Sequence, residues 1–148
     1  MIMSLVIALE CVAIFANFAM PMLQTSHVRA QAAVLAREMG EVKNAATQAY
    51  GGTGAWAQDQ SEGIVPSELK SYLPAGFTFV HPHYRYDWNS WALGDRSILA
   101  PRDGALAGVT VVTDDPRLAA AVAASLPKDD LKLALEHRAT LVLERKGY

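Results

Sequence analysis

The chain opens with an apolar segment, residues 1–23, in which Glu10 is the only charged side chain. At a rise of about 1.5 Å per residue, a helix of this length spans the roughly 30 Å hydrocarbon core of a bilayer. A cleaved signal peptide has a basic start and a shorter apolar run, and a soluble core helix is rarely apolar on all sides. The pattern therefore favours a single-pass membrane anchor, formed by residues 1–24, rather than either of these alternatives.

Glu10, Asn17 and Pro21 interrupt the apolar segment. A carboxylate near mid-bilayer costs about 2.5–3.5 kcal/mol unless it is protonated, paired or turned into a protein interior. We expect Glu10 to contact a membrane helix of another subunit, with a neutral carboxyl group tolerated in lipid as the alternative. Asn17 is expected to share those partners. Pro21 is expected to bend or loosen the helix.

The helix is expected to continue as an amphipathic stalk over residues 25–50, ending at Gly51-Gly52. Apolar side chains recur there at alternating spacings of four and three, which is a heptad stripe. The stripe consists of Val28, Ala32, Leu35, Met39, Val42, Ala46 and Ala49. Because three of its members are alanines, we expect it to lie closely on the chain's own head, with a homomeric coiled coil as the alternative.

Residues 51–148 are predicted to form one α+β head. Its first half is predicted to contain a short helix, two strands and an irregular stretch, at residues 66–73, 77–80, 84–88 and 94–108, respectively. Aromatic and charged residues alternate in the second strand, so that Tyr84, Tyr86 and Trp88 share one face. Asn89-Ser90 is expected to turn the chain after this strand.

The last third of the chain is predicted as a strand, a helix and a strand, at residues 109–113, 117–126 and 140–144. Asp115 and Pro116 are a strong helix start, as the N-cap and the first helical residue. Residues 129–137 are expected to be a helical turn or a loop. The fold class is thus α+β, with a long N-terminal helix packed on a small, mostly antiparallel sheet with short helices.

Composition and motifs provide little support for catalysis. A formal net charge of −2 argues against a nucleic-acid surface, and the glycines at 51, 52 and 54 lack the lysine and the preceding strand of a phosphate-binding loop. One cysteine and four scattered histidines do not form a zinc motif. His81 and His83 are expected in a turn. The head is therefore predicted to be non-catalytic, with no cofactor and no metal. Tyr84, Tyr86 and Trp88 are expected to form core together with a partly exposed face of the sheet, and the alternative is a surface that stacks on a sugar or a base.

The order of these elements resembles type IV pilins and pseudopilins. In those proteins an apolar helix with a glutamate and a proline continues into an amphipathic half, on which a small sheet packs. Glu10 lies closer to Pro21 than the spacing of that family, so its partner is not expected to be a neighbour's N-terminus. The whole chain is more similar to the PilM family of thin (type IVb) pilus biogenesis. The segments that carry this resemblance are the aromatic strand at 84–88, the valine-rich strand at 109–113 and the helix after it.

The resemblance implies a non-catalytic component of a bacterial inner membrane, with its head in the periplasm. Its partners would be the lipid bilayer and other pilus or secretion proteins of a conjugative system. Further copies of the chain are an additional candidate. Positive charges after the anchor, at Arg29, Arg37 and Lys43, would instead place the head in the cytoplasm. The alternatives are a minor pilin within the filament and a membrane-anchored binding module that uses the aromatic face.

Overall fold

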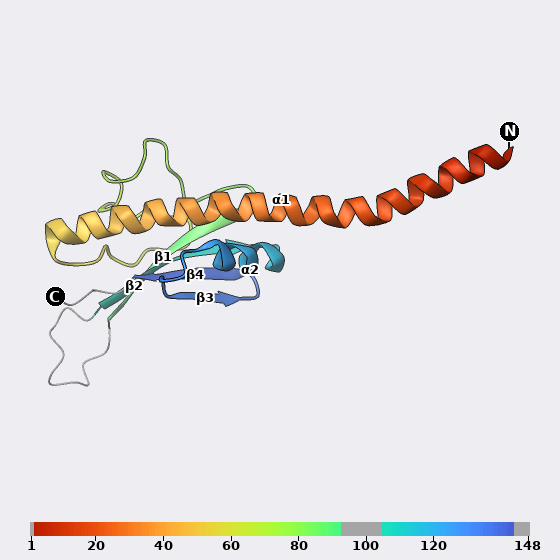
Figure 1. Cartoon of the computed structure of the whole chain (residues 1–148). Helices are drawn as coiled ribbons and strands as arrows, with labels where there is room; N and C mark the ends of the chain where they lie inside the picture. Colours follow the sequence, from red (N-terminus) through yellow and green to blue (C-terminus); the bar gives the residue numbers. More distant parts are fainter. Residues whose placement is uncertain (1, 93–104, 144–148) are drawn as a thin grey trace.

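The computed structural model describes residues 2–92 and 105–143, and the side chains of 24–91 and 106–143. One helix, α1 (Ile2–Thr53), runs along the head and continues well beyond it (Figure 1). The predicted end at Gly51-Gly52 is wrong, because both glycines are helical. Gly54 ends the helix instead: its φ of 72° is favourable for glycine, and its N–H donates to the Tyr50 carbonyl at 2.7 Å.

Four antiparallel strands form one sheet in the order β1-β2-β4-β3. The strands are β1 (Tyr84–Ala92), β2 (Ala105–Thr113), β3 (Lys132–Leu135) and β4 (Arg138–Leu143). Tyr86 lies opposite Val111, and Val111 lies opposite Ala139, so the inward residues of three strands form rows. The predicted α+β class, with a long helix on an antiparallel sheet, is confirmed.

The short helix α2 (Pro116–Ser125) begins as the sequence predicts. Asp115 is the N-cap, its carboxylate accepts the Arg117 N–H at 3.0 Å, and Pro116 occupies the first helical turn. The apolar face of α2 packs beside α1 on the same side of the sheet (Figure 1). Two helices thus cover one face of the sheet, and within the described residues no helix covers the other.

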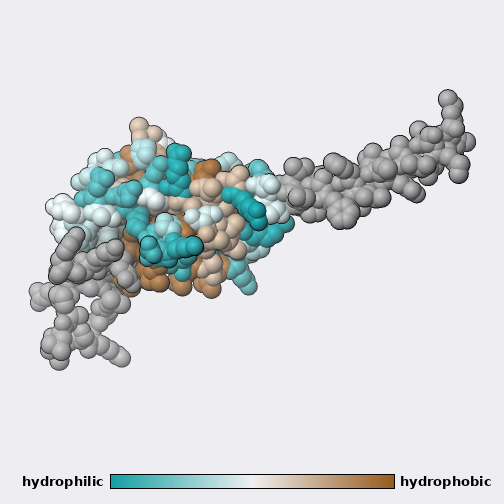
Figure 2. Space-filling view, in the orientation of Figure 1, coloured by the Kyte–Doolittle hydropathy of each residue, from teal (hydrophilic) through white to brown (hydrophobic). Residues whose placement is uncertain are grey.

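The hydrophobic core lies between these two helices and the sheet. Leu35 and Met39 from α1 belong to the same buried cluster as Val109, Val111 and two aromatic side chains of β1. Polar residues cover much of the surface in Figure 2, but apolar side chains gather along the lower border of the head, where β3 lies in Figure 1.

Several predictions of local structure are corrected. Residues 66–73 form consecutive turns rather than a helix, and 77–80 contribute a single bridge, from Val80 to Arg85, rather than a strand. Asn89-Ser90 lies within β1, which continues to Ala92. Part of the segment expected to be helical turn or loop, 129–137, is β3. Of the stretch expected to be irregular, 105–108 belongs to β2 and 94–104 lies outside the described residues.

Candidate functional site

The residues predicted to make contacts in the membrane lie on the part of α1 that extends beyond the head. Glu10, Asn17 and Pro21 are within the helix, and their side chains lie outside the described residues. Among the helices whose side chains are described, none is both long and apolar enough to cross a membrane. The predicted anchor, residues 1–23, is not part of that set.

The heptad stripe of α1 packs on the chain's own head. Its fully buried members are Ala32, Leu35, Met39, Val42 and Ala46, and Val28 is partly buried against the same core. Val34, adjacent to Leu35, stays 54% exposed. The apolar face of α1 alongside the head is therefore already occupied by the sheet and α2.

The aromatic strand forms part of the core rather than a surface. Tyr86 and Trp88 are fully buried, and Tyr84 is partly buried. The Trp88 indole N–H donates to the Ala57 carbonyl at 3.1 Å, which satisfies its one polar group. The expectation that these aromatic residues belong to the core is confirmed, and the alternative of an exposed binding face is wrong, because α1 and the loop after it cover that side of the sheet.

A carboxylate on α1, that of Glu38, accepts hydrogen bonds from two tyrosine hydroxyls of this strand. Glu38 Oε2 accepts a hydrogen bond from the Tyr86 hydroxyl at 2.5 Å and another from the Tyr84 hydroxyl at 3.3 Å. The His81 ring stacks on Tyr84, with centroids 4.3 Å apart, and its Nε2 lies 2.9 Å from the Thr78 carbonyl. The cluster fastens α1 to the edge of the sheet.

This environment makes both tyrosine hydroxyls weaker acids. Burial, the negative charge of Glu38 and its hydrogen bond raise the pKa of Tyr84 to about 12. Burial and the hydrogen bond to Glu38 raise the pKa of Tyr86 further. Both groups stay neutral donors across the physiological range, so the cluster is suited to holding the fold rather than to proton transfer near neutral pH.

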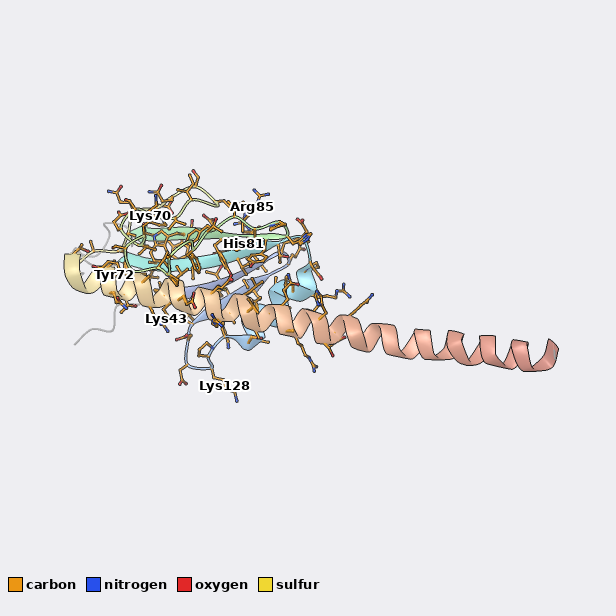
Figure 3. All side chains as sticks on the ribbon, turned by 90° about the horizontal axis from the view of Figure 1, so that it is seen from above. Lys43, Lys70, Tyr72, His81, Arg85 and Lys128 are labelled. Atoms are coloured by element: carbon orange, nitrogen blue, oxygen red, sulfur yellow. The ribbon has the colours of Figure 1, made fainter. Side chains whose placement is uncertain are left out.

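A shallow groove of about 480 Å³ separates α1 from the segment that links α2 to β3. Small residues of α1, among them Ala33, Ala36 and Gly40, form its wall. Lys43 Nζ crosses it to Asp130 Oδ1 at 2.6 Å. In Figure 3, Lys43 and Lys128 lie on one side of α1, and Lys70 and Arg85 lie on the other. Ser125, which also lines the groove, donates its hydroxyl to the Ala121 carbonyl at 2.8 Å.

The outer face of the sheet is partly apolar and partly charged. Arg85 and Arg138 flank Val112 in one row of the sheet, and Glu62 reaches both guanidinium groups, at 3.5 and 3.9 Å. Trp91 lies against Gly108, where an added Cβ would meet the indole at 3.0 Å. Sequence reasoning missed this face, although the alternation of Leu131, Leu133 and Leu135 was a usable signal.

The described residues hold no group of three or more His, Cys, Asp or Glu side chains that could bind a metal ion. The adjacent carboxylates of Asp114 and Asp115 are separated in role, since Asp115 caps α2 and Asp114 is exposed. The candidate sites in the described part of the chain are therefore surfaces for binding. They are the projecting helix, the groove beside α1, and the uncovered face and edge of the sheet.

Comparison of the chain with models of protein families, with curated proteins and with solved structures found no match. The architecture itself is an N-terminal helix packed on a four-stranded antiparallel sheet, which is a pilin-like layout.

Proposed function

We propose that this protein is a non-catalytic component of the bacterial inner membrane that serves type IVb pilus biogenesis or a related conjugative or secretion machine. Its N-terminal helix assembles with other membrane helices, and its head docks partners in the periplasm. The proposal rests on the resemblance to the PilM family, on the apolar residues 1–23 and on the pilin-like layout.

The observation that carries the proposal is the division of α1 into two parts. From Val28 onward the helix packs on the head, whereas residues 24–27 are exposed and the helix continues beyond them to Ile2. The protruding part coincides with the apolar segment. A helix that leaves its own domain with apolar side chains all round needs another apolar environment, and a bilayer supplies one.

Fractionation of cells tests this proposal, using the full chain with a C-terminal tag. The protein should be recovered in the inner membrane, and protease added to spheroplasts should digest the tagged head. A tag that is protected in spheroplasts and digested only after lysis would place the head in the cytoplasm and overturn the periplasmic docking role. Recovery in the soluble fraction would overturn the anchor.

The minor pilin is the second candidate, and the same pilin-like layout favours it. A minor pilin leaves the membrane with the filament. The tagged protein would then be found in filaments sheared from cells, whereas a biogenesis component would remain with the cell envelope.

A further inference from the structure

The two edges of the sheet differ in how their backbone groups are used. The outer edge of β1 is capped by other parts of the chain. Tyr86 donates its N–H to the Phe79 carbonyl, and its own carbonyl accepts the Gly63 N–H at 2.8 Å. The carbonyls of Tyr84 and Trp88 accept N–H groups from His81 and Gln60. This edge is therefore closed to strand addition from Tyr84 to Trp88.

The outer edge of β3 is open in the part of the chain that the structure describes. The Val142 N–H donates to the Leu131 carbonyl at 2.9 Å, so Leu131, and with it Leu133 and Leu135, directs its backbone groups toward β4. The backbone groups of Lys132 and Ala134 then point away from the sheet. Within the described residues no backbone group pairs with them.

The lysine of β3, Lys132, does not place its charge at this open edge. A lysine on an edge strand normally keeps other strands away through its charge. The Lys132 ammonium is instead held by carbonyls at the end of α2, those of Leu126 at 2.9 Å and Pro127 at 3.3 Å. Its charge is thus tied down on the helix-covered side of the sheet.

The same short segment carries a concentrated apolar surface. Leu131, Leu133 and Leu135 are 50%, 58% and 72% exposed, and all three lie on the outer face of the sheet. A soluble edge strand rarely exposes three leucines in a row on one face, and such a surface marks an interaction site.

We propose that β3 pairs antiparallel with β3 of a second copy of this chain, joining the two sheets across a two-fold axis. Pairing of β3 with the β1 edge of another copy is blocked from Tyr84 to Trp88, because that part of the edge is capped. An isologous contact is the arrangement in which one open edge supplies both sides of the interface. This inference uses only the head and is independent of the proposed function.

The backbone pattern also gives the register. Leu133 lies opposite Leu133 on the axis, at a position without hydrogen bonds, and Leu131 lies opposite Leu135 on either side. Lys132 lies opposite Ala134, and these residues exchange the backbone hydrogen bonds that neither makes within its own sheet. Burying the leucines of both copies together supplies the hydrophobic contribution.

A disulfide across the axis tests the pairing in the full chain in detergent micelles, with Cys11→Ser to remove the native thiol. Residues opposite each other at positions without hydrogen bonds lie about 4.5 Å apart between Cα atoms, within the range of a disulfide. Under mild oxidation Leu133→Cys should yield several-fold more cross-linked dimer than Ala124→Cys, an exposed position on α2. Equal yields from the two variants would overturn the proposal.

Mixing two variants tests the register. Leu131→Cys combined with Leu135→Cys should cross-link as a heterodimer, while each variant alone should give no more dimer than Ala124→Cys. Strong cross-linking of Leu135→Cys with Leu133→Cys but not with Leu131→Cys would overturn the stated register.

A proline provides the second test, because Ala134 directs its N–H to the open edge. Ala134→Pro removes the intermolecular donor and leaves the bonds between β3 and β4 in place, whereas Ala134→Val keeps the donor. Light scattering of the micellar protein should show dimers for Ala134→Val and their loss for Ala134→Pro. A folded Ala134→Pro protein that dimerises as well as Ala134→Val would contradict the model.

The membrane helix is tested separately by Glu10→Leu. If Leu133→Cys still cross-links in the Glu10→Leu background, the β3 contact forms without the helix contact. A cross-link that disappears with Glu10→Leu would show that the membrane helix, rather than β3, brings the copies together, and would overturn the β3 pairing as an independent contact.

Discussion

The Tyr86 hydroxyl donates a 2.5 Å hydrogen bond to the Glu38 carboxylate and so joins the inner face of β1 to α1. Tyr86 is fully buried, and no buried polar side-chain atom among the described residues lacks a hydrogen-bond partner. A single carboxylate thus satisfies a hydroxyl that would otherwise be costly to bury.

Truncating either partner of this bond should destabilise the head. We expect Glu38→Ala to lower the free energy of unfolding by about 1–3 kcal/mol, because it leaves the Tyr86 hydroxyl buried without an acceptor. Tyr86→Phe removes the hydroxyl and should cost less. Urea unfolding of the full chain in micelles, followed by tryptophan fluorescence, measures both. Arg37→Ala is the control, because it alters the neighbouring exposed side chain; a loss equal to that of Glu38→Ala would contradict the assigned bond.

Alkaline pH should weaken the same contact. The pKa of Tyr84 is about 12 in the folded chain, above its ordinary value of 10.0, and that of Tyr86 is also raised. A raised pKa means that the unfolded chain loses its protons first. The stabilisation is therefore complete below about pH 10 and is lost as the pH rises through the folded pKa.

Absorbance of tyrosinate and urea midpoints between pH 9 and 12 check this dependence, with the range chosen around the ordinary tyrosine pKa of about 10. The double variant Tyr84→Phe and Tyr86→Phe should lose less stability over this range than the native chain. An identical decline in both proteins would show that other groups cause it.

The packing of α1 on the head predicts opposite outcomes at two adjacent residues. Leu35 is fully buried and Val34 is 54% exposed. Leu35→Ala should cost about 2–5 kcal/mol because it leaves a cavity, and Val34→Ala should stay within about 0.5 kcal/mol. Thermal unfolding monitored by circular dichroism compares them. Similar losses at both positions would mean that α1 does not present this face to the core.

Much of the fold could be predicted from local patterns. The stripe containing Leu35 and Met39 predicts the buried face of α1, and Asp115-Pro116 predicts the start of α2, because capping depends on adjacent residues. The segment 66–73 has a helical apolar pattern but forms turns, since tertiary packing of Leu69 and Leu73 outweighs so short a helix. β3 was missed because it is a strand of only four residues whose leucines face outward, so that backbone hydrogen bonds to β4 rather than burial of its side chains hold it in the sheet.

The surfaces were harder to predict than the elements. An alternating aromatic strand has two faces, and the sequence does not say which face a helix covers. The covered face carries Tyr86 and Trp88, so of the two interpretations of this strand the core is correct, while Trp91 and the leucines of β3 remain outside. The partners of Glu38 lie far along the chain, and sequence patterns do not reveal such contacts.

Glu10 provides the last prediction, which concerns assembly rather than stability. If α1 enters a membrane as proposed and the carboxyl group contacts another helix there, Glu10→Leu should impair assembly with partners while the head stays folded, because that residue lies on the part of α1 beyond the head. Glu10→Gln keeps the shape and the hydrogen-bonding capacity and should retain more assembly than Glu10→Leu. Blue native electrophoresis of solubilised membranes reads out the complex, and circular dichroism reads out the head. Normal complex formation by Glu10→Leu would remove this side chain from the mechanism, whereas a loss accompanied by unfolding of the head would assign it a role in stability instead.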